Sequence, residues 1–331
     1  MLALNYSLGA IAVCHALLAL LECFLILGIT HRLGALRLNR SLEEWKLVRR
    51  AGEFAGSSLA TTLLQNLCWF TPPVLLGILT GGTVSTTALY AGQRPCFIVS
   101  ELNWRGAEIL FTASASQGGV HKDKACSELI VFGTTCILAV AMPLCIILFI
   151  IAPDLVHLWL RDARPDTATV MRLTALGVIA DAVWVGPLHV LWGRGRARRV
   201  LILTAVVTAV VLILNVVLIP RLGATGVAFA FAVSMWIGAI ATTIDAARQI
   251  KSSWLRLLAF SFSEAALPSV CLAVFALTAS ALLQGNPRAL VLIAAIGGAT
   301  VYTVVYWIQQ RIGGYARGNS EPWFARRTNR F

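Results

Sequence analysis

The chain has 331 residues, of which 58% are hydrophobic and 13% charged, and its formal net charge is +12. Soluble domains carry about twice this charged fraction, so the composition excludes an ordinary water-soluble globular protein. Long apolar runs also recur along the whole sequence. We therefore expect an all-α, polytopic membrane protein.

Nine segments are long and apolar enough to cross a membrane as helices. A helix needs about 20 residues to span a hydrocarbon core of roughly 30 Å, whereas the strands of a membrane barrel would be half as long and would alternate. In chain order, the expected spans lie within residues 2–30, 54–93, 88–115, 129–153, 169–192, 200–220, 222–244, 265–287 and 289–310.

The positive charges lie almost entirely on one side of the membrane if the connections between these spans alternate. One side then holds twenty Lys and Arg residues, and the other holds only Arg161, Arg164, Arg221 and Arg288. Cytoplasmic loops carry such an excess, so we expect a multi-pass protein of the plasma (cell inner) membrane, with its C-terminus in the cytoplasm and its N-terminus outside. The same rule explains the basic loop at residues 193–199 without a nucleic acid as partner.

A polar stripe runs along the expected span at residues 88–115. It consists of Tyr90, Arg94, Glu101, Arg105 and Glu108. At 100° per residue, the four charged members lie within about 60° of one another. If these four faced lipid, insertion would cost roughly 10–14 kcal/mol, at about 2.5–3.5 kcal/mol each. The stripe must therefore face protein or a water-filled cavity, and its five residues are the candidate substrate-cavity residues.

Arg94 is the candidate anion-binding residue of the stripe. Glu101 and Arg105 are four residues apart, and Arg105 and Glu108 are three apart, so these side chains can pair along the helix. Arg94 lies seven residues from its nearest acid and is left free for a diphosphate or an acidic sugar, because a guanidinium binds phosphate oxygens bidentately. The alternative is that the charges only brace one helix against another.

Asp181, in the expected span at residues 169–192, is the candidate for binding a coupling ion. It lies eight residues before His189, about 80° around the helix, so the two side chains can share an interior side. A carboxylate there can bind a proton or a sodium ion, and no other cofactor is expected. A hydrogen bond to a neighbouring helix explains Asp181 equally well.

Neither the cysteines nor the histidines predict a metal site. Seven of the eight cysteines fall inside expected spans, and no CxxC motif or His/Cys pair at zinc spacing is present. The only acid and histidine cluster is the outer loop with Asp154, His157, Asp162 and Asp166, residues that also simply end helices and face water. We expect no metal, no catalytic residues and no enzyme.

The segment LNVVLIPRLGATGVAFAFAVS, residues 214–234, places a proline and glycines between two apolar runs. A phosphate-binding P-loop needs GxxxxGK[ST] after a strand, and this segment has neither the lysine nor the strand. Pro220 ends one span and Gly223 permits the backbone to turn. We predict a tight turn between two membrane helices on the outer side.

This segment also resembles a signature of Wzx-like polysaccharide flippases. These proteins, of the O-antigen or teichoic-acid type, belong to the multidrug/oligosaccharidyl-lipid/polysaccharide exporter superfamily. Three further segments are similar to the same family in the same order: LLGILTGGTVSTTALYAGQRP (75–95), MPLCIILFIIAPDLVHLWLRD (142–162) and VMRLTALGVIADAVWVGPLHVLWGRGRARRVLIL (170–203). The resemblance covers about residues 54–310.

The resemblance implies a MATE-like fold of two six-helix bundles around a central cavity, with extra C-terminal helices. It divides the chain into the last helix of the first bundle (1–30), a basic cytoplasmic linker (31–53), the second bundle (54–248), two additional helices (249–310) and a basic cytoplasmic tail (311–331). The first five helices of such a protein are expected to be missing, so the chain resembles a truncated form.

The implied function is a flippase that moves lipid-linked oligosaccharide or polysaccharide precursors, such as those of lipopolysaccharide, across the plasma membrane by alternating access. Its implied partners are the lipid-linked saccharide, membrane lipids and polysaccharide assembly proteins. A cation-coupled multidrug (MATE-type) exporter and an inactive fragment stay open as alternatives. A membrane glycosyltransferase or polymerase would need a large outer loop, and the longest expected outer loop is under 20 residues.

Overall fold

The structure is a computed structural model that describes residues 17, 21, 24, 25, 42–81, 83–116, 123–160, 165–249, 253–283 and 287–315. Its contacts divide the chain into two units, Met1–Ala55 and Gly56–Phe331. The first unit is described mainly over residues 42–55, which are helical and hold an ion pair of 3.1 Å between Arg49 Nε and Glu53 Oε1. All remaining observations concern the second unit.

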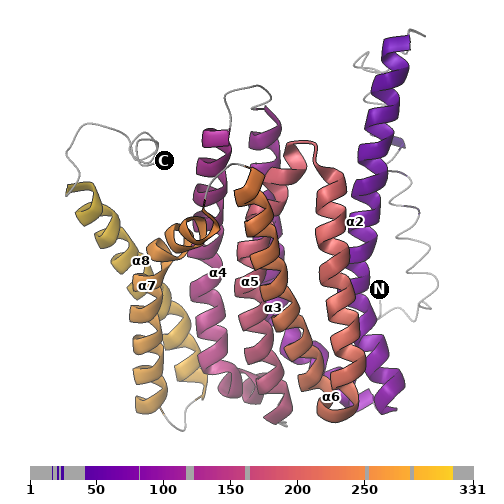
Figure 1. Ribbon diagram of the computed structural model, residues 1–331. Helices are drawn as coiled ribbons and strands as arrows, with labels where there is room; N and C mark the ends of the chain where they lie inside the picture. The colour runs from indigo at the N-terminus through magenta and orange to yellow at the C-terminus, as the bar shows by residue number, and fades with distance from the viewer. Residues whose placement is uncertain are drawn as a thin grey trace. The chain divides into compact units, whose positions relative to one another are not determined.

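The described elements are helices, as the sequence predicts. In chain order they are α2 (Leu42–Thr80), α3 (Thr83–Ser116), α4 (Asp123–Leu160), α5 (Pro165–Gly193), α6 (Ala197–Gln249), α7 (Trp254–Leu282) and α8 (Pro287–Tyr315) (Figure 1). Within the second unit α5 packs against α3, α4 and α6, and α7 and α8 pack against α4.

Six helices of the described part are long and apolar enough to cross a membrane, which confirms the helical membrane fold. The count of nine spans stays a prediction. The span expected at 2–30 lies almost wholly outside the described residues, and the one expected at 88–115 lies in α3, which is too polar to qualify. The spans expected at 200–220 and 222–244 lie in one continuous stretch, α6.

The turn predicted after Pro220 lies inside α6. Gly223 has φ 56° and ψ −131°, and it joins two helical halves at a kink. This positive φ is readily adopted only by glycine, which lacks the Cβ atom that would clash. At the other end of the two halves, Arg199 Nη1 and Asp245 Oδ1 form an ion pair of 2.9 Å. The two halves therefore form an antiparallel helical hairpin.

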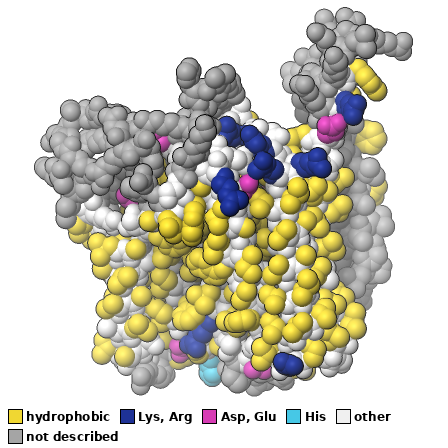
Figure 2. Space-filling view, viewed as in Figure 1, with side chains coloured by type: hydrophobic (Ala, Val, Ile, Leu, Met, Phe, Trp, Pro, Cys, Tyr) yellow, Lys and Arg dark blue, Asp and Glu magenta, His cyan; other side chains and the backbone are white. Residues whose placement is uncertain are grey.

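The outer surface of the second unit is apolar. Figure 2 shows hydrophobic side chains over most of the drawn face, with the described Lys and Arg side chains toward its two ends. One exposed stripe follows α2 at Leu59, Leu63, Leu67, Val74 and Ile78. A water-soluble protein rarely exposes so much contiguous apolar surface, so this face suits contact with lipid.

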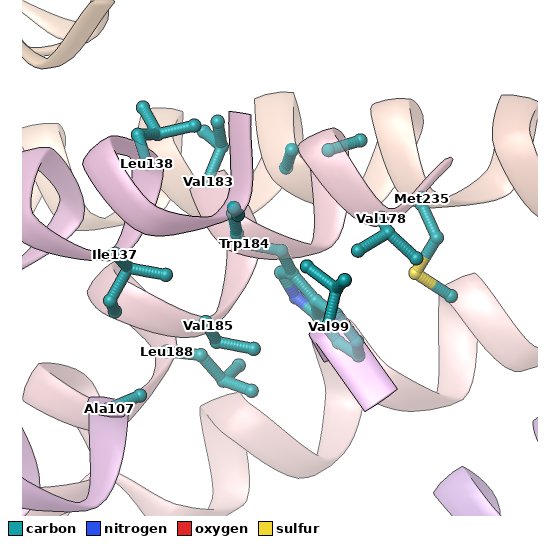
Figure 3. Packing of buried hydrophobic residues seen from close by; sticks show 14 of the residues in the cluster. Val99, Ala107, Ile137, Leu138, Val178, Val183, Trp184, Val185, Leu188 and Met235 are labelled. Atoms are coloured by element: carbon teal, nitrogen blue, oxygen red, sulfur yellow. The ribbon is translucent and has the colours of Figure 1, made fainter. Parts of the chain in front are cut away.

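Helix α5 is enclosed on all sides over part of its length. Every residue from 181 to 190 is buried. Figure 3 shows Trp184 and Leu188 of α5 among Val99 of α3, Ile137 of α4 and Met235 of α6, all members of one buried cluster. A helix that is apolar on every side is stable only when other helices surround it. The position of α5 therefore fixes the places of α3, α4 and α6.

Close approach of α3 to α5 depends on Gly92. A Cβ atom at this position would lie 2.7 Å from the carbonyl oxygen of Thr167 and 2.7 Å from Val170 Cγ1, both on α5. The Thr167 oxygen belongs to the backbone and cannot move aside as a flexible side chain would. Any residue larger than glycine would push the two helices apart.

We predict that Gly92→Ala destabilises the protein by about 1–3 kcal/mol, the usual cost of overpacking a core. Thermal unfolding in detergent, followed by circular dichroism, measures the effect. The matched control is Gly56→Ala on α2, where a Cβ atom would meet nothing within 4 Å. The control should unfold at the wild-type temperature or slightly above it, because alanine favours a helix over glycine. Equal unfolding temperatures for the two variants would contradict the close approach.

Candidate functional site

A cavity of about 450 Å³ opens between α2 and α3 of the second unit. Its lining is polar and aromatic, in contrast to the apolar outer surface. The lining residues are Asn66, Trp69 and Phe70 of α2 and Tyr90, Arg94, Phe97, Ser100, Glu101, Trp104, Arg105 and Glu108 of α3. The part of α3 that lines the cavity extends from Tyr90 to Glu108, 18 residues further along the chain, which is roughly 27 Å along the helix axis.

The structure brings the predicted polar stripe to this cavity. Tyr90, Arg94, Glu101, Arg105 and Glu108 all lie on its wall. If the cavity is filled with water, this placement spares the four charges the cost of facing lipid. Their part in binding a substrate stays a prediction.

The ion pairs within the stripe differ in part from the expectation. Arg105 Nη1 donates a hydrogen bond of 2.9 Å to Glu108 Oε1. The other expected pair, Glu101 with Arg105, does not form among the described residues, because the guanidinium of Arg105 is directed to Glu108 instead. Glu101 is thus an exposed carboxylate on the cavity wall with no cation bound to it in the described part of the chain.

Arg94 faces the cavity without a partner of opposite charge. Within the described ranges no ion pair or hydrogen bond engages its guanidinium, and its side chain is exposed. A guanidinium offers five N–H donors in a planar fork and keeps its charge in a poorly solvated site. Arg94 can therefore grip an anion with two parallel hydrogen bonds.

Asp181 lies behind the cavity wall, fully buried on α5. Ser100 Oγ donates a hydrogen bond of 2.8 Å to Asp181 Oδ2, and Asn103 Nδ2 donates one of 3.2 Å to the same oxygen. Asn103 Nδ2 also donates to the carbonyl oxygen of Val178, at 3.3 Å. Ser100 at the same time lines the cavity, so the hydrogen bond from Ser100 links the Asp181 carboxylate to the cavity wall.

His189 is buried on α5 but engages different groups. Its Nδ1 lies 2.8 Å from the carbonyl oxygen of Val185, one helical turn earlier. Its ring packs edge-on against Trp104 of the cavity wall, with ring centres 5.2 Å apart. His189 therefore supports the wall, and the hydrogen bonds to Asp181 come from α3.

Sequence reasoning missed Phe97, Ser100, Asn103 and Trp104 on α3 and Trp69 on α2. The spacing on α3 could have found three of them, because Phe97, Ser100 and Trp104 follow Arg94 at three- and four-residue steps on the same side of the helix. Asn103 and Trp69 could not be found in this way, since their roles depend on which helix packs beside them.

The described residues hold no group of three His, Cys, Asp or Glu side chains that could bind a metal ion. Of the four residues expected in an outer loop, Asp154 (half-buried) and His157 (exposed) lie in helix α4, and Asp166 (exposed) lies in helix α5, so the expected loop is largely helical. Asp162, the fourth member, lies outside the described residues.

The family model described as lipid II flippase MurJ matches residues 108–296, more than half of the chain. The chain belongs to the lipid II flippase MurJ family. Proteins of the MurJ type are transporters rather than enzymes, and the chain is a multi-pass membrane protein. Membership of the Wzx-like polysaccharide flippases is not confirmed.

Solved structures agree with the MurJ family at the level of the fold. A lipid II flippase MurJ in an inward closed conformation has 14% sequence identity and a TM-score of 0.61, over 75% of this chain and 52% of that one. A MOP superfamily transporter from Pyrococcus furiosus has 16% identity and a TM-score of 0.50, over 78% of this chain and 63% of that one. The chain thus spans about half of the solved MurJ protein. No curated protein sequence matches it.

We predict that Ser100→Ala destabilises the protein by about 1–3 kcal/mol, because the buried Asp181 carboxylate would lose a donor that nothing replaces. Asn103→Leu should cost a similar amount. The double variant should cost clearly less than the two single changes together, since both side chains bind one oxygen. Thermal unfolding in detergent measures all three. Ser116→Ala, at an exposed position on the same helix, is the control, and strict additivity would contradict a shared site.

Proposed function

We propose that the chain forms part of a flippase that carries a lipid-linked saccharide precursor across the plasma membrane by alternating access. The observation that carries this proposal is the guanidinium of Arg94, which has no partner among the described residues and lies in a polar cavity of a membrane-spanning unit. A diphosphate that joins a lipid to a saccharide is an anion of the kind that arginine binds best. Membership of the MurJ family makes lipid II the first substrate to test, and other polysaccharide precursors follow.

The arrangement in the membrane is part of the same proposal. The uneven distribution of Lys and Arg between the two sides supports a cytoplasmic C-terminus. We assign nine spans to the chain, with the helix at residues 1–30, the bundle at 54–248 and the helices at 249–310 as separate parts. Polysaccharide assembly proteins are proposed as neighbours in the membrane.

A cation-coupled exporter is the second candidate, because Glu101 presents to the cavity a carboxylate that no cation of the described residues engages. Such an exporter would bind an organic cation at this acid and would have no use for Arg94. The flippase uses Arg94 and leaves Glu101 for neutral polar groups. The two candidates therefore differ in which variant stops transport.

We predict that Arg94→Ala in the full-length protein lowers the transport of the lipid-linked precursor by roughly ten- to hundredfold, because a charged hydrogen-bond partner of the diphosphate is lost. The precursor should still accumulate in the membrane, where labelling on each side separates synthesis from transport. Arg311→Gln, an exposed cation on α8, is the control. Unchanged transport by Arg94→Ala, with transport lost in Glu101→Gln, would favour the exporter.

Coupling to a proton or sodium gradient is proposed to act through Asp181. The carboxylate is fully buried near the middle of α5 and is reached from the cavity through Ser100. We predict that Asp181→Asn makes transport insensitive to the gradient, because the amide cannot change its charge. Transport into vesicles with and without an imposed gradient measures this. A gradient response as large as that of the wild type would exclude Asp181.

A further inference from the structure

Anion binding by Arg94 leaves most of the cavity wall unexplained. Five of the lining residues are aromatic, namely Trp69, Phe70, Tyr90, Phe97 and Trp104. An anion has no use for aromatic faces, since their electron clouds are negative. The ligand must therefore present a second, different surface to this part of the wall.

Trp69 is held in place from two sides. Its ring makes an edge-on contact with Phe97 of α3, with ring centres 4.7 Å apart and planes at 87°. It also packs against Phe231 of α6, at 4.8 Å. Three helices thus fix the orientation of one half-buried ring whose remaining surface lines the cavity.

Trp104 is held in the same manner by α5. Its ring lies edge-on to Trp184, with centres 5.9 Å apart, and edge-on to His189, at 5.2 Å. Both supporting residues are buried. Flat side chains that are fixed before a ligand arrives bind at little cost in conformational entropy. The two tryptophans are therefore preformed platforms on the cavity wall.

The charges of the wall divide into two levels along α3. Arg94 lies near Phe97, at the level of Trp69, and carries the positive charge. Glu101, Arg105 and Glu108 lie around Trp104, and since Arg105 is paired with Glu108, Glu101 leaves this level negative. The second level begins 7 residues after Arg94 and ends 14 after it, or roughly 10–21 Å along the helix.

We propose that the level of Glu101, Trp104 and Glu108 is a saccharide subsite, and that Trp69 and Phe97 flank the link to the diphosphate on Arg94. Sugar rings offer apolar C–H faces that stack on fixed aromatic rings and hydroxyl groups that donate to carboxylates. This inference rests on the proposed function, because it assigns the second half of the same ligand. It sets the direction of the ligand, with the saccharide toward the C-terminal half of α3.

An organic cation would also stack on tryptophan beside a carboxylate. It would then lie in a cavity that also contains the unpaired charge of Arg94, which it would not use. A ligand that is anionic at one end and carries hydroxyl groups at the other can bind both Arg94 and the level of Glu101 and Trp104. The observations therefore favour the saccharide.

Two probes of equal charge test the proposal on the purified full chain in lipid nanodiscs. One is a short-chain prenyl diphosphate diester with a disaccharide, and the other carries a methyl group in place of the disaccharide. Tryptophan fluorescence reports binding of each probe. We expect the wild type to bind the disaccharide probe about tenfold more tightly than the methyl probe, and Trp104→Leu or Glu101→Gln to reduce this ratio to near one. The conservative Trp104→Phe should keep most of the ratio.

The control variant is Trp307→Leu, an exposed tryptophan on α8 that does not line the cavity, and its ratio should equal that of the wild type. A wild type that binds both probes equally, or a ratio that survives in Trp104→Leu and Glu101→Gln, would overturn the saccharide subsite. The organic cation tetraphenylphosphonium is the competitor. If it displaced the disaccharide probe equally well from the wild type and from Arg94→Ala, the saccharide subsite would also be overturned. Failure of the methyl probe to bind at all would instead refute the proposed function, so the two failures are distinguishable.

Discussion

The hydrogen bonds from Ser100 and Asn103 to the carboxylate of Asp181 determine which side of α3 faces α5. A buried carboxylate is costly unless hydrogen-bond donors satisfy it. Rotation of α3 about its axis would remove both donors from Asp181 and is therefore unfavourable. Asn103 lies about 160° around the helix from Glu101 and from Arg105. By holding one side of α3 against α5, the contact turns the charged stripe to the cavity. The chemistry of the cavity thus depends on a buried polar contact between α3 and α5, in which Ser100 also lines the cavity.

Packing around α5 reinforces the same arrangement. Gly92 lets α3 approach the backbone of α5 near one end, and the buried cluster around Trp184 fills the space between α3, α4 and α5. Trp184 also supports Trp104 from behind, so the core and the cavity wall share a residue contact. A change in the core is therefore expected to reach the wall through this ring. Rigid support of this kind is what a binding site needs to hold its groups in place.

The cavity combines groups that rarely occur together inside a membrane. An arginine and a glutamate, neither of them paired within the described part of the chain, line a space of about 450 Å³ together with two fixed tryptophans. Each charge would be expensive in lipid, and the proposed function would give these residues a common purpose. The chain spans about half of the solved MurJ protein, and under the proposed function these groups would supply one part of a transport pathway. The two charge levels on α3 set the direction in which a ligand with two chemically different ends can lie.

The sequence by itself determined the class of protein and much of its cavity. The composition and the length of the apolar segments are sufficient to predict a helical membrane protein. In lipid, a segment of this length can satisfy its backbone N–H and C=O groups only as a helix. Helical periodicity placed Tyr90, Arg94, Glu101, Arg105 and Glu108 on one side, because angular position follows from residue number alone. The turn at Gly223 and the ion pair of Arg105 with Glu108 depend only on residues close in sequence. Both were predicted and both are present.

Only the tertiary structure decided what each side of a helix meets. The partners of Asp181 lie 78 and 81 residues away in sequence, and no periodic pattern links them. The choice of Glu108 over Glu101 by Arg105, and the support of Trp69 by Phe231, likewise depend on the rotamers and neighbours that packing selects. Short motifs around residues 214–234 pointed to the Wzx-like flippases, whereas the match over residues 108–296 shows the lipid II flippase MurJ family. The spacing of residues along one helix determines the side of that helix on which each side chain lies. Which helices contact that side is determined by the free energy of the whole packed unit.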